Sequence, residues 1–175
     1  MCDMDTKNAR VSGDTPDTYD PDAFPHPSVT VDVVAFTALE DRLCVLLVER
    51  GIWPFEGMWA LPGGFVRMDE ELEAAAHREL TEETGIAEAH YLEQLFTFGA
   101  IGRDPRTRVI SVAYFALMPG PASECRPLPG TDAVAARWWP LDELPPLAFD
   151  HQEIIDTALA RLRAKLGYTS VAYAL

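Results

Sequence analysis

The first half of the chain carries two apolar segments with the patterns of β-strands. Residues 28–39 (SVTVDVVAFTAL) are rich in β-branched side chains and partly alternate, which predicts a strand. Residues 43–50 (LCVLLVER) are almost all apolar, which is typical of a central strand covered on both faces. The polar residues between them predict a turn, whereas residues 51–64, punctuated by Gly and Pro, predict a loop.

Further strand patterns follow in the second half of the chain. Residues 91–100 and 107–119 predict two strands joined by the turn IGRDPR, and residues 135–141 predict a short strand. Residues 119–133 are rich in Pro and Gly and predict a loop.

A first helix is predicted from about residue 70 to residue 84. Asp69 is suited to cap its N-terminus, and Gly85 is suited to end it. Apolar side chains that recur every four residues form its core stripe: Leu72, Ala76 and Leu80.

A last helix is predicted to end near residue 166. Asp150 and Glu153 have the spacing of a capping arrangement at its start. Its predicted buried stripe consists of Ile155, Leu159, Leu162 and Leu166. Strands and helices in this mixed order, with hairpin-like spacings, predict an α/β sandwich with a mixed β-sheet.

The chain of 175 residues is long enough for one domain with a sizeable core. Residues 1–27 are rich in Asp, Thr and Pro without an apolar period, which predicts a disordered or arm-like segment. We expect the folded domain to span residues 28–168, followed by a C-terminal tail over residues 169–175.

Composition narrows the class of protein. The formal net charge of −14 argues against a nucleic-acid surface, which needs clustered Lys and Arg. The three cysteines are odd in number and far apart, which argues against a disulfide framework and fits a cytoplasmic location. Apolar runs are too short for a transmembrane helix, and the N-terminus has no signal-peptide pattern, so we expect no membrane partner.

Three acidic residues gather on one side of the first predicted helix. Glu79, Glu82 and Glu83 stand at i, i+3 and i+4 and therefore share one face, where like charges repel. A solvated acidic face is the ordinary interpretation of such a group. Closely spaced carboxylates are also the hard ligands that Mg²⁺ or Mn²⁺ prefers, and Mg²⁺ usually bridges to substrate phosphates. A metal site would therefore predict a phosphate-bearing substrate.

The surrounding residues resemble the Nudix hydrolase signature. Its fixed positions match over 23 residues in the order Gly64, Glu70, Arg78-Glu79-Leu80, Glu82-Glu83 and Gly85-Ile86. The resemblance implies a Nudix-type α/β/α sandwich and Mg²⁺- or Mn²⁺-dependent hydrolysis of a nucleoside diphosphate linked to another moiety. It also implies that Glu79 and Glu83 are the main metal ligands, that the Gly63 carbonyl completes the metal shell, and that Glu82 is a further ligand or the base that activates water.

Arg78 is predicted to hold a ligand carboxylate in place by pairing with Glu70 or Glu79. In several Nudix branches the catalytic base comes from a later loop, where Glu124 and Asp132 are the candidates in this chain.

Outside the signature, the chain is similar to ADP-ribose pyrophosphatases and to the Nudix domain of regulators of NAD metabolism. The stretches that carry this similarity are WALPGGFV, GRDPRTRVISVAYFAL and LAFDHQEIIDTALARLRAKLGYT. In those regulators a DNA-binding domain follows, whereas this chain stops at Leu175, so we expect a stand-alone enzyme or a truncated product. The favoured reaction is hydrolysis of ADP-ribose to AMP and ribose 5-phosphate, and a homodimer is expected by analogy.

Candidate substrate contacts are less specific than the signature. Guanidinium groups suit phosphate, and aromatic rings suit a base, although each type also occurs in surface salt bridges or in the core. The candidates are Arg50, Trp53, Phe55, Arg103 and Arg108, with Phe96 and Phe98 as further possible faces for adenine. His77 and His151 are interpreted as helix-surface or capping residues without chemistry.

Two alternatives to ADP-ribose hydrolysis stay open at this point. One is a module that senses ADP-ribose or a related dinucleotide with little turnover. The other is a hydrolase of another nucleotide, such as an oxidised nucleoside triphosphate, a dinucleoside polyphosphate or NADH.

Overall fold

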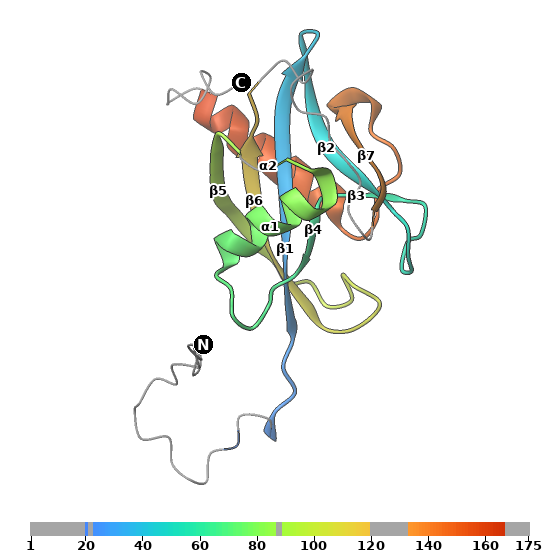
Figure 1. Cartoon of the computed structure of the whole chain (residues 1–175), viewed down its shortest axis with the longest axis vertical. Helices are drawn as coiled ribbons and strands as arrows, with labels where there is room; N and C mark the ends of the chain where they lie inside the picture. The colour runs from blue at the N-terminus through green and yellow to red at the C-terminus, as the bar shows by residue number, and fades with distance from the viewer. Residues whose placement is uncertain (1–19, 21–22, 87–88, 120–132, 167–175) are drawn as a thin grey trace, which may run out of the picture.

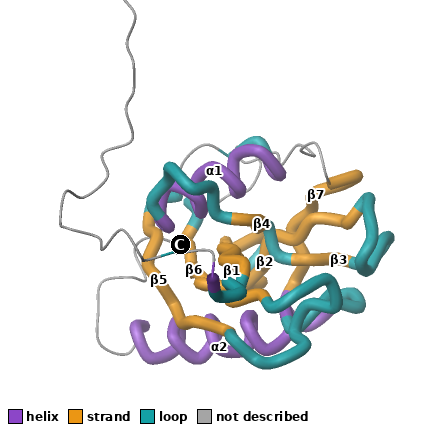
Figure 2. Tube along the Cα trace, turned by 90° about the horizontal axis from the view of Figure 1, so that it is seen from below, coloured by secondary structure: helices purple, strands orange, loops and turns teal. Residues whose placement is uncertain are grey.

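A computed structural model describes residue 20 and residues 23–86, 89–119 and 133–166 of the chain. A β-sheet forms the middle layer, with helix α1 (Leu72–Thr84) on one face and helix α2 (His151–Leu166) on the other (Figure 2). This arrangement is the predicted α/β/α sandwich. Within the described ranges, neither helix is long and apolar enough to cross a membrane.

Seven strands of the described chain form one mixed sheet (Figure 1). Their main order is β3-β2-β1-β6-β5, with β4 paired to β1 and β7 paired to β2. The bounds are β1 Ser28–Leu39, β2 Arg42–Arg50, β3 Trp59–Ala60, β4 Gly63–Phe65, β5 Tyr91–Phe98, β6 Val109–Leu117 and β7 Ala133–Pro140. Only β1 and β6 run parallel among these pairs, which makes the sheet mixed as predicted.

The central strand β1 explains where the site forms. Its last residues pair with β2, whereas Thr30–Asp32 pair with β4, so two different strands share one of its edges. Parallel pairing with β6 covers the other edge. Buried side chains on β1 alternate between the two helix layers, with Val31, Val33 and Ala35 toward α1 and Val34 and Phe36 toward α2.

The residue range 51–64 is not a single loop, which corrects the sequence-based prediction. It contains β3 and the start of β4, because short segments there pair with β2 and β1. Two- and three-residue strands carry too little periodicity to be recognised before their partners are known.

Helix α1 begins two residues later than predicted. Glu71 occupies the N-cap without a side-chain hydrogen bond, so the assignment of the cap to Asp69 is wrong. Gly85 ends the helix in the left-handed conformation, with φ of 74°, as predicted. Ala76 and Leu80 of the predicted stripe are buried, and Leu72 is partly buried.

Helix α2 buries a stripe that is shifted from the predicted one. His151, Ile154, Ile155, Ala158 and Leu162 are buried, whereas Leu159 is half-buried and Leu166 is exposed. The side chain of Asp150 bonds to Arg103. The N-terminal segment 1–19, the tail 169–175 and the candidate bases Glu124 and Asp132 lie outside the described residues.

Candidate functional site

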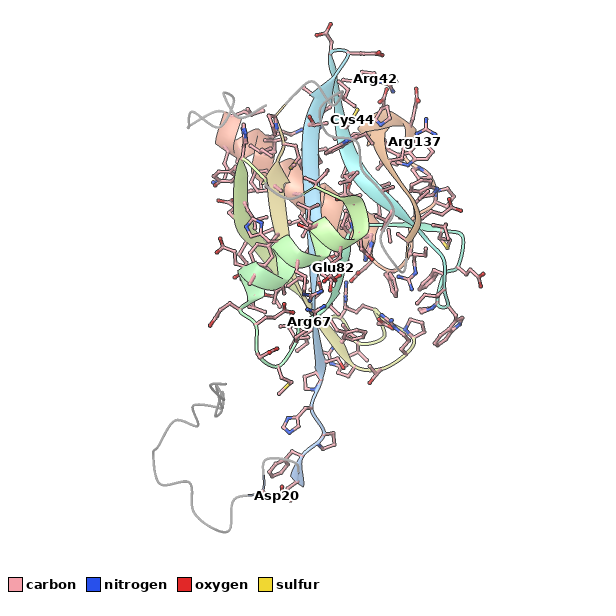
Figure 3. The ribbon with its side chains drawn as sticks, viewed as in Figure 1. Asp20, Arg42, Cys44, Arg67, Glu82 and Arg137 are labelled. Atoms are coloured by element: carbon pink, nitrogen blue, oxygen red, sulfur yellow. The ribbon has the colours of Figure 1, made fainter. Side chains whose placement is uncertain are left out.

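A cavity of about 620 Å³ opens where β1, β4, the signature helix and the β5–β6 connection meet. One wall consists of carboxylates and two arginines: Arg67, Arg78, Glu79, Glu82 and Glu83. The other wall brings together Arg50, Arg103, Asp104, Arg106, Phe149 and His151. Figure 3 shows Arg67 and Glu82 in the same region below α1, far from Arg42 and Cys44 at the other end of β2.

Arg78 joins three carboxylates on the acidic wall. Its Nε and Nη2 donate to both oxygens of Glu70, at 2.8 and 2.6 Å. Its Nη1 donates to Glu79 at 2.5 Å and to Glu82 at 3.1 Å. Because the guanidinium also reaches the Phe65 carbonyl at 3.2 Å, it fixes α1 against β4. The predicted pairing of Arg78 with Glu70 or Glu79 thus occurs with both residues.

Two successive glycines allow strand β4 to lie directly against this helix. The Gly63 N–H donates to Glu83 Oε2 at 3.0 Å. A Cβ at Gly64 would lie 2.5 Å from Glu79 Oε1, closer than real Cβ contacts allow. Gly64 therefore lets a carboxylate approach β4 closely, and a side chain at this position would displace the end of Glu79.

The surroundings shift the pKa values of Glu79 and Glu70 in opposite directions. Burial raises the pKa of Glu79 above its ordinary value, although the bond from Arg78 opposes the shift. Hydrogen bonds from Arg78 lower the pKa of Glu70 from 4.5 to about 2. Glu70 therefore stays ionised and holds Arg78 in place across the neutral pH range.

Replacing Glu70 with glutamine should lower the melting temperature at pH 7, with a difference from wild type that shrinks in acid. The folded-state pKa of Glu70, about 2, lies below its ordinary 4.5. Its ionised form therefore stabilises the folded protein above pH 4.5, and this stabilisation is lost as the pH falls toward 2. Thermal unfolding followed by circular dichroism between pH 7 and 3 measures the difference. A difference that stays constant over this range would contradict the assignment.

The opposite wall contains a buried ionic network centred on Arg103. Its side chain is only 4% exposed, and it donates two bonds to Asp150, at 2.8 and 2.6 Å. Its Nη2 also lies 3.4 Å from Asp32 Oδ2, the oxygen to which Ser111 donates. Arg103 thus lines the cavity as predicted for a substrate contact, but two carboxylates already engage it.

Aromatic rings and guanidinium groups stack beside this network. The Arg50 guanidinium lies 5.0 Å from the Phe149 ring, and Arg106 lies 5.1 Å from Phe65 and 5.8 Å from Phe149. Asp104 holds the Arg106 guanidinium from its edge, at 2.7 to 3.2 Å. This wall therefore offers flat, positively charged surfaces with fixed orientation.

The structure brings some predicted contacts into the cavity and leaves others outside its lining. Arg50 and Arg103 line it, whereas Trp53, Phe55 and Arg108 are not among the lining residues. Trp53 is 67% exposed, and Phe55 packs edge-on against Phe149. Arg108 donates instead to the backbone carbonyls of Gly99, Ala100 and Val109.

Several residues that line the cavity were not predicted as site residues from the sequence: Asp32, Arg67, Asp104, Arg106, Phe149 and His151. Asp32 had a usable signal, because an acidic residue within an apolar strand is costly unless it is paired. The interpretation of His151 as a surface or capping residue is wrong, since it is buried at 4% exposure.

The acidic wall has the donor chemistry of a site for a hard divalent cation. Together with Glu70, which pairs with Arg78 outside the cavity lining, the wall has four carboxylates for two guanidiniums, and this leaves a formal excess of two negative charges. Oxygen donors of this kind suit Mg²⁺ or Mn²⁺. Among the described residues, no three His, Cys, Asp or Glu side chains converge as a ready metal cage. Arg78 and the Gly63 N–H hold the carboxylates in their present positions, so binding of a cation requires side-chain rearrangement.

Comparison with known protein families gives one match over most of the chain. A model of the NUDIX domain matches residues 26–158. The chain is 39% identical over 130 residues to the ADP-ribose pyrophosphatase of Methanocaldococcus jannaschii, covering 74% of this chain and 72% of that protein.

A regulator is similar over a still longer stretch. The chain is 38% identical over 161 residues to the ADPR responsive transcriptional repressor NtrR of Acinetobacter baylyi. The match covers 90% of this chain, which spans 63% of the length of that repressor. Among solved structures, the NUDIX domain of Shewanella oneidensis NrtR complexed with ADP ribose superposes with a TM-score of 0.76 and 41% identity. That match covers 83% of this chain and 94% of the Shewanella chain.

Proposed function

The chain belongs to the NUDIX domain family, and we propose that it is a Mg²⁺- or Mn²⁺-dependent hydrolase of ADP-ribose. The products would be AMP and ribose 5-phosphate. The observation that carries the proposal is the cavity itself, whose lining combines the carboxylates of α1 with arginines from other elements. Similarity to an ADP-ribose pyrophosphatase and to an ADP-ribose-bound NUDIX domain supports the choice of substrate.

The proposed roles follow from the positions of the acidic side chains. Glu79 and Glu83 would hold the cation together with the Gly63 carbonyl, and Arg78 would orient Glu79 while Glu70 holds Arg78. A bound divalent cation supplies polarisation of the diphosphate and a more acidic water. Glu82, whose side chain is 47% exposed, would be a further ligand or the base that accepts the proton from water.

The other wall of the cavity, which contains Arg50, Arg103 and Arg106, would bind the diphosphate and the two groups that it links. Arg50 lines the cavity and stacks on Phe149, so we propose it as a contact to phosphate. Arg103 remains a proposed contact, although it would have to share its guanidinium with Asp150 and Asp32. Phe149 and Phe65, rather than Trp53 and Phe55, are the aromatic rings within reach of a bound ligand.

A substrate panel tests this function. ADP-ribose, NADH, a dinucleoside polyphosphate and an oxidised nucleoside triphosphate are each incubated with Mg²⁺, with Mn²⁺ or with EDTA, and the products are separated by chromatography. We expect AMP and ribose 5-phosphate from ADP-ribose, no product with EDTA, and unchanged helix content on chelation. A triphosphate as the best substrate would overturn the assignment of ADP-ribose.

A second candidate function is an ADP-ribose sensor with little turnover. Its support is the 38% identity to a repressor named as ADPR responsive, over 90% of this chain. Calorimetric binding of ADP-ribose in the presence of Mg²⁺, without AMP formation over hours, would favour the sensor over the enzyme.

The oligomeric state, the cellular location and the absence of a nucleic-acid partner remain predictions. The homodimer is testable by sedimentation, where a species of only 19.4 kDa would contradict it. A cytoplasmic location and the absence of a nucleic-acid partner rest on composition alone, and similarity to a transcriptional repressor makes a direct DNA-binding assay worthwhile.

A further inference from the structure

His151 connects helix α2 to the loop Leu61–Gly63, which leads from β3 into the first residue of β4. The residue lies at the first position of α2, on the face of the sheet opposite α1, and it lines the cavity. Its Nδ1 accepts a hydrogen bond of 2.8 Å from the Leu61 N–H. This bond joins residues 90 positions apart in the chain.

The ring has a defined protonation pattern in this position. A backbone N–H only donates, so Nδ1 must be the unprotonated nitrogen. Burial lowers the pKa of His151, which favours the neutral ring with its proton on Nε2. Nε2 faces Asp32 Oδ1 at 3.6 Å, and Asp32 is held in turn by Ser111 and Arg103. The surrounding carboxylate thus favours the same tautomer that Leu61 requires.

Three successive residues of the loop are each held by a different part of the protein. Leu61 donates to His151 from α2, and the Pro62 carbonyl accepts from the Val33 N–H of β1 at 2.8 Å. Gly63 donates to Glu83 from α1 at 3.0 Å. The loop is therefore hydrogen-bonded to both helix layers, and His151 is its hydrogen-bond partner in α2.

We propose that His151 is a positioning residue that fixes Leu61–Gly63 and thereby sets where Gly63 meets Glu83. This role rests on the proposed function only in its effect on turnover, because the placement of the loop itself is measurable without substrate. The His151 ring makes polar contacts with Leu61 and Asp32, and neither of these residues is a proposed cation ligand.

Two amide variants separate the roles of the two ring nitrogens. His151→Asn keeps an acceptor near the position of Nδ1, whereas His151→Gln moves its polar atoms toward the position of Nε2. We expect His151→Gln to speed amide hydrogen exchange at Leu61 and Gly63 by roughly tenfold or more, and His151→Asn to preserve most of the protection. His90→Asn and His90→Gln, at an exposed position outside the cavity lining, are matched controls that should leave both amides unchanged.

Turnover should follow the same order. A misplaced loop in His151→Gln should lower kcat by roughly tenfold with a smaller change in KM, whereas His151→Asn should stay close to wild type. Equal protection of Leu61 and Gly63 in all variants would overturn the proposal, as would faster exchange with unchanged kcat. If His151→Gln fails to fold, exchange as fast in His151→Asn as in His151→Ala would overturn it.

The experiments distinguish failure of the proposed enzymatic function from failure of the positioning role of His151. If wild-type protein turns over none of the nucleotides tested, the enzyme assignment fails, while exchange at Gly63 still decides whether His151 positions the loop. Protection lost in the glutamine variant and kept in the asparagine variant supports the proposal in that case as well.

Discussion

Replacing Glu83 with glutamine is expected to lower kcat for ADP-ribose hydrolysis by about 100-fold or more while leaving the fold intact. Glu83 accepts the Gly63 N–H at 3.0 Å, and the glutamine carbonyl oxygen can accept the same bond. The substitution therefore keeps the contact with β4 and removes the negative charge that a cation needs. Initial rates at saturating Mg²⁺, together with circular dichroism, measure the two effects separately.

Glu79→Gln should cause a loss of similar size, because Glu79 lines the same cavity one turn earlier on α1. Glu73→Gln is the matched control, since Glu73 is exposed on the same helix and does not line the cavity. It should leave kcat unchanged. Near-normal rates for both cavity variants at saturating Mg²⁺ would refute the assignment of these carboxylates as cation ligands.

The acidic wall could be predicted because its geometry is local. Glu79, Glu82 and Glu83 belong to one helix, and helical spacing alone brings them to one side. The same holds for β1 and β2, whose apolar patterns are long enough to show their period. The link from Arg78 to Glu70 also lies within the signature and was anticipated.

The opposite wall could not be predicted, because it depends on contacts between distant parts of the chain. Arg103, Asp32 and Asp150 come from three elements, and their pairings span 47 and 71 positions. Residue type alone left Arg103 as either a substrate contact or a surface salt bridge, whereas the fold buries it beside two carboxylates. Phe149, which takes a positive φ of 53°, enters the cavity through a backbone conformation that no pattern indicates.

Aromatic side chains gave the weakest predictions for the same reason. Trp53 and Phe55 lie in a stretch dense in large rings, which made them candidates for a base. Whether they line the cavity depends on the path of the β2–β3 connection, where Phe55 packs edge-on against Phe149 with the ring centroids 4.8 Å apart. Composition of a loop does not determine this path.

Replacing Gly64 with alanine should abolish most activity, with a loss in kcat of about 100-fold or more. The added methyl group would lie 2.5 Å from Glu79 Oε1 and 2.7 Å from its Cδ. The Glu79 side chain is 11% exposed and accepts from Arg78 at 2.5 Å, so any shift of its carboxylate also changes this contact. Either the carboxylate or strand β4 must therefore move, and overpacking of this kind also costs about 1–3 kcal/mol of stability.

Gly99→Ala provides the matched control for this substitution. A Cβ at Gly99 meets only Arg108 Nη2, at an ordinary contact distance of 3.7 Å. We expect kcat to be unchanged and the free energy of unfolding to stay within about 0.5 kcal/mol of wild type. Steady-state kinetics of Gly64→Ala and Gly99→Ala measure kcat, and urea unfolding of both variants measures the free energy of unfolding. If Gly64→Ala retained the activity of Gly99→Ala, the close contact between β4 and Glu79 would have no part in catalysis, because the methyl group cannot be accommodated without disturbing it.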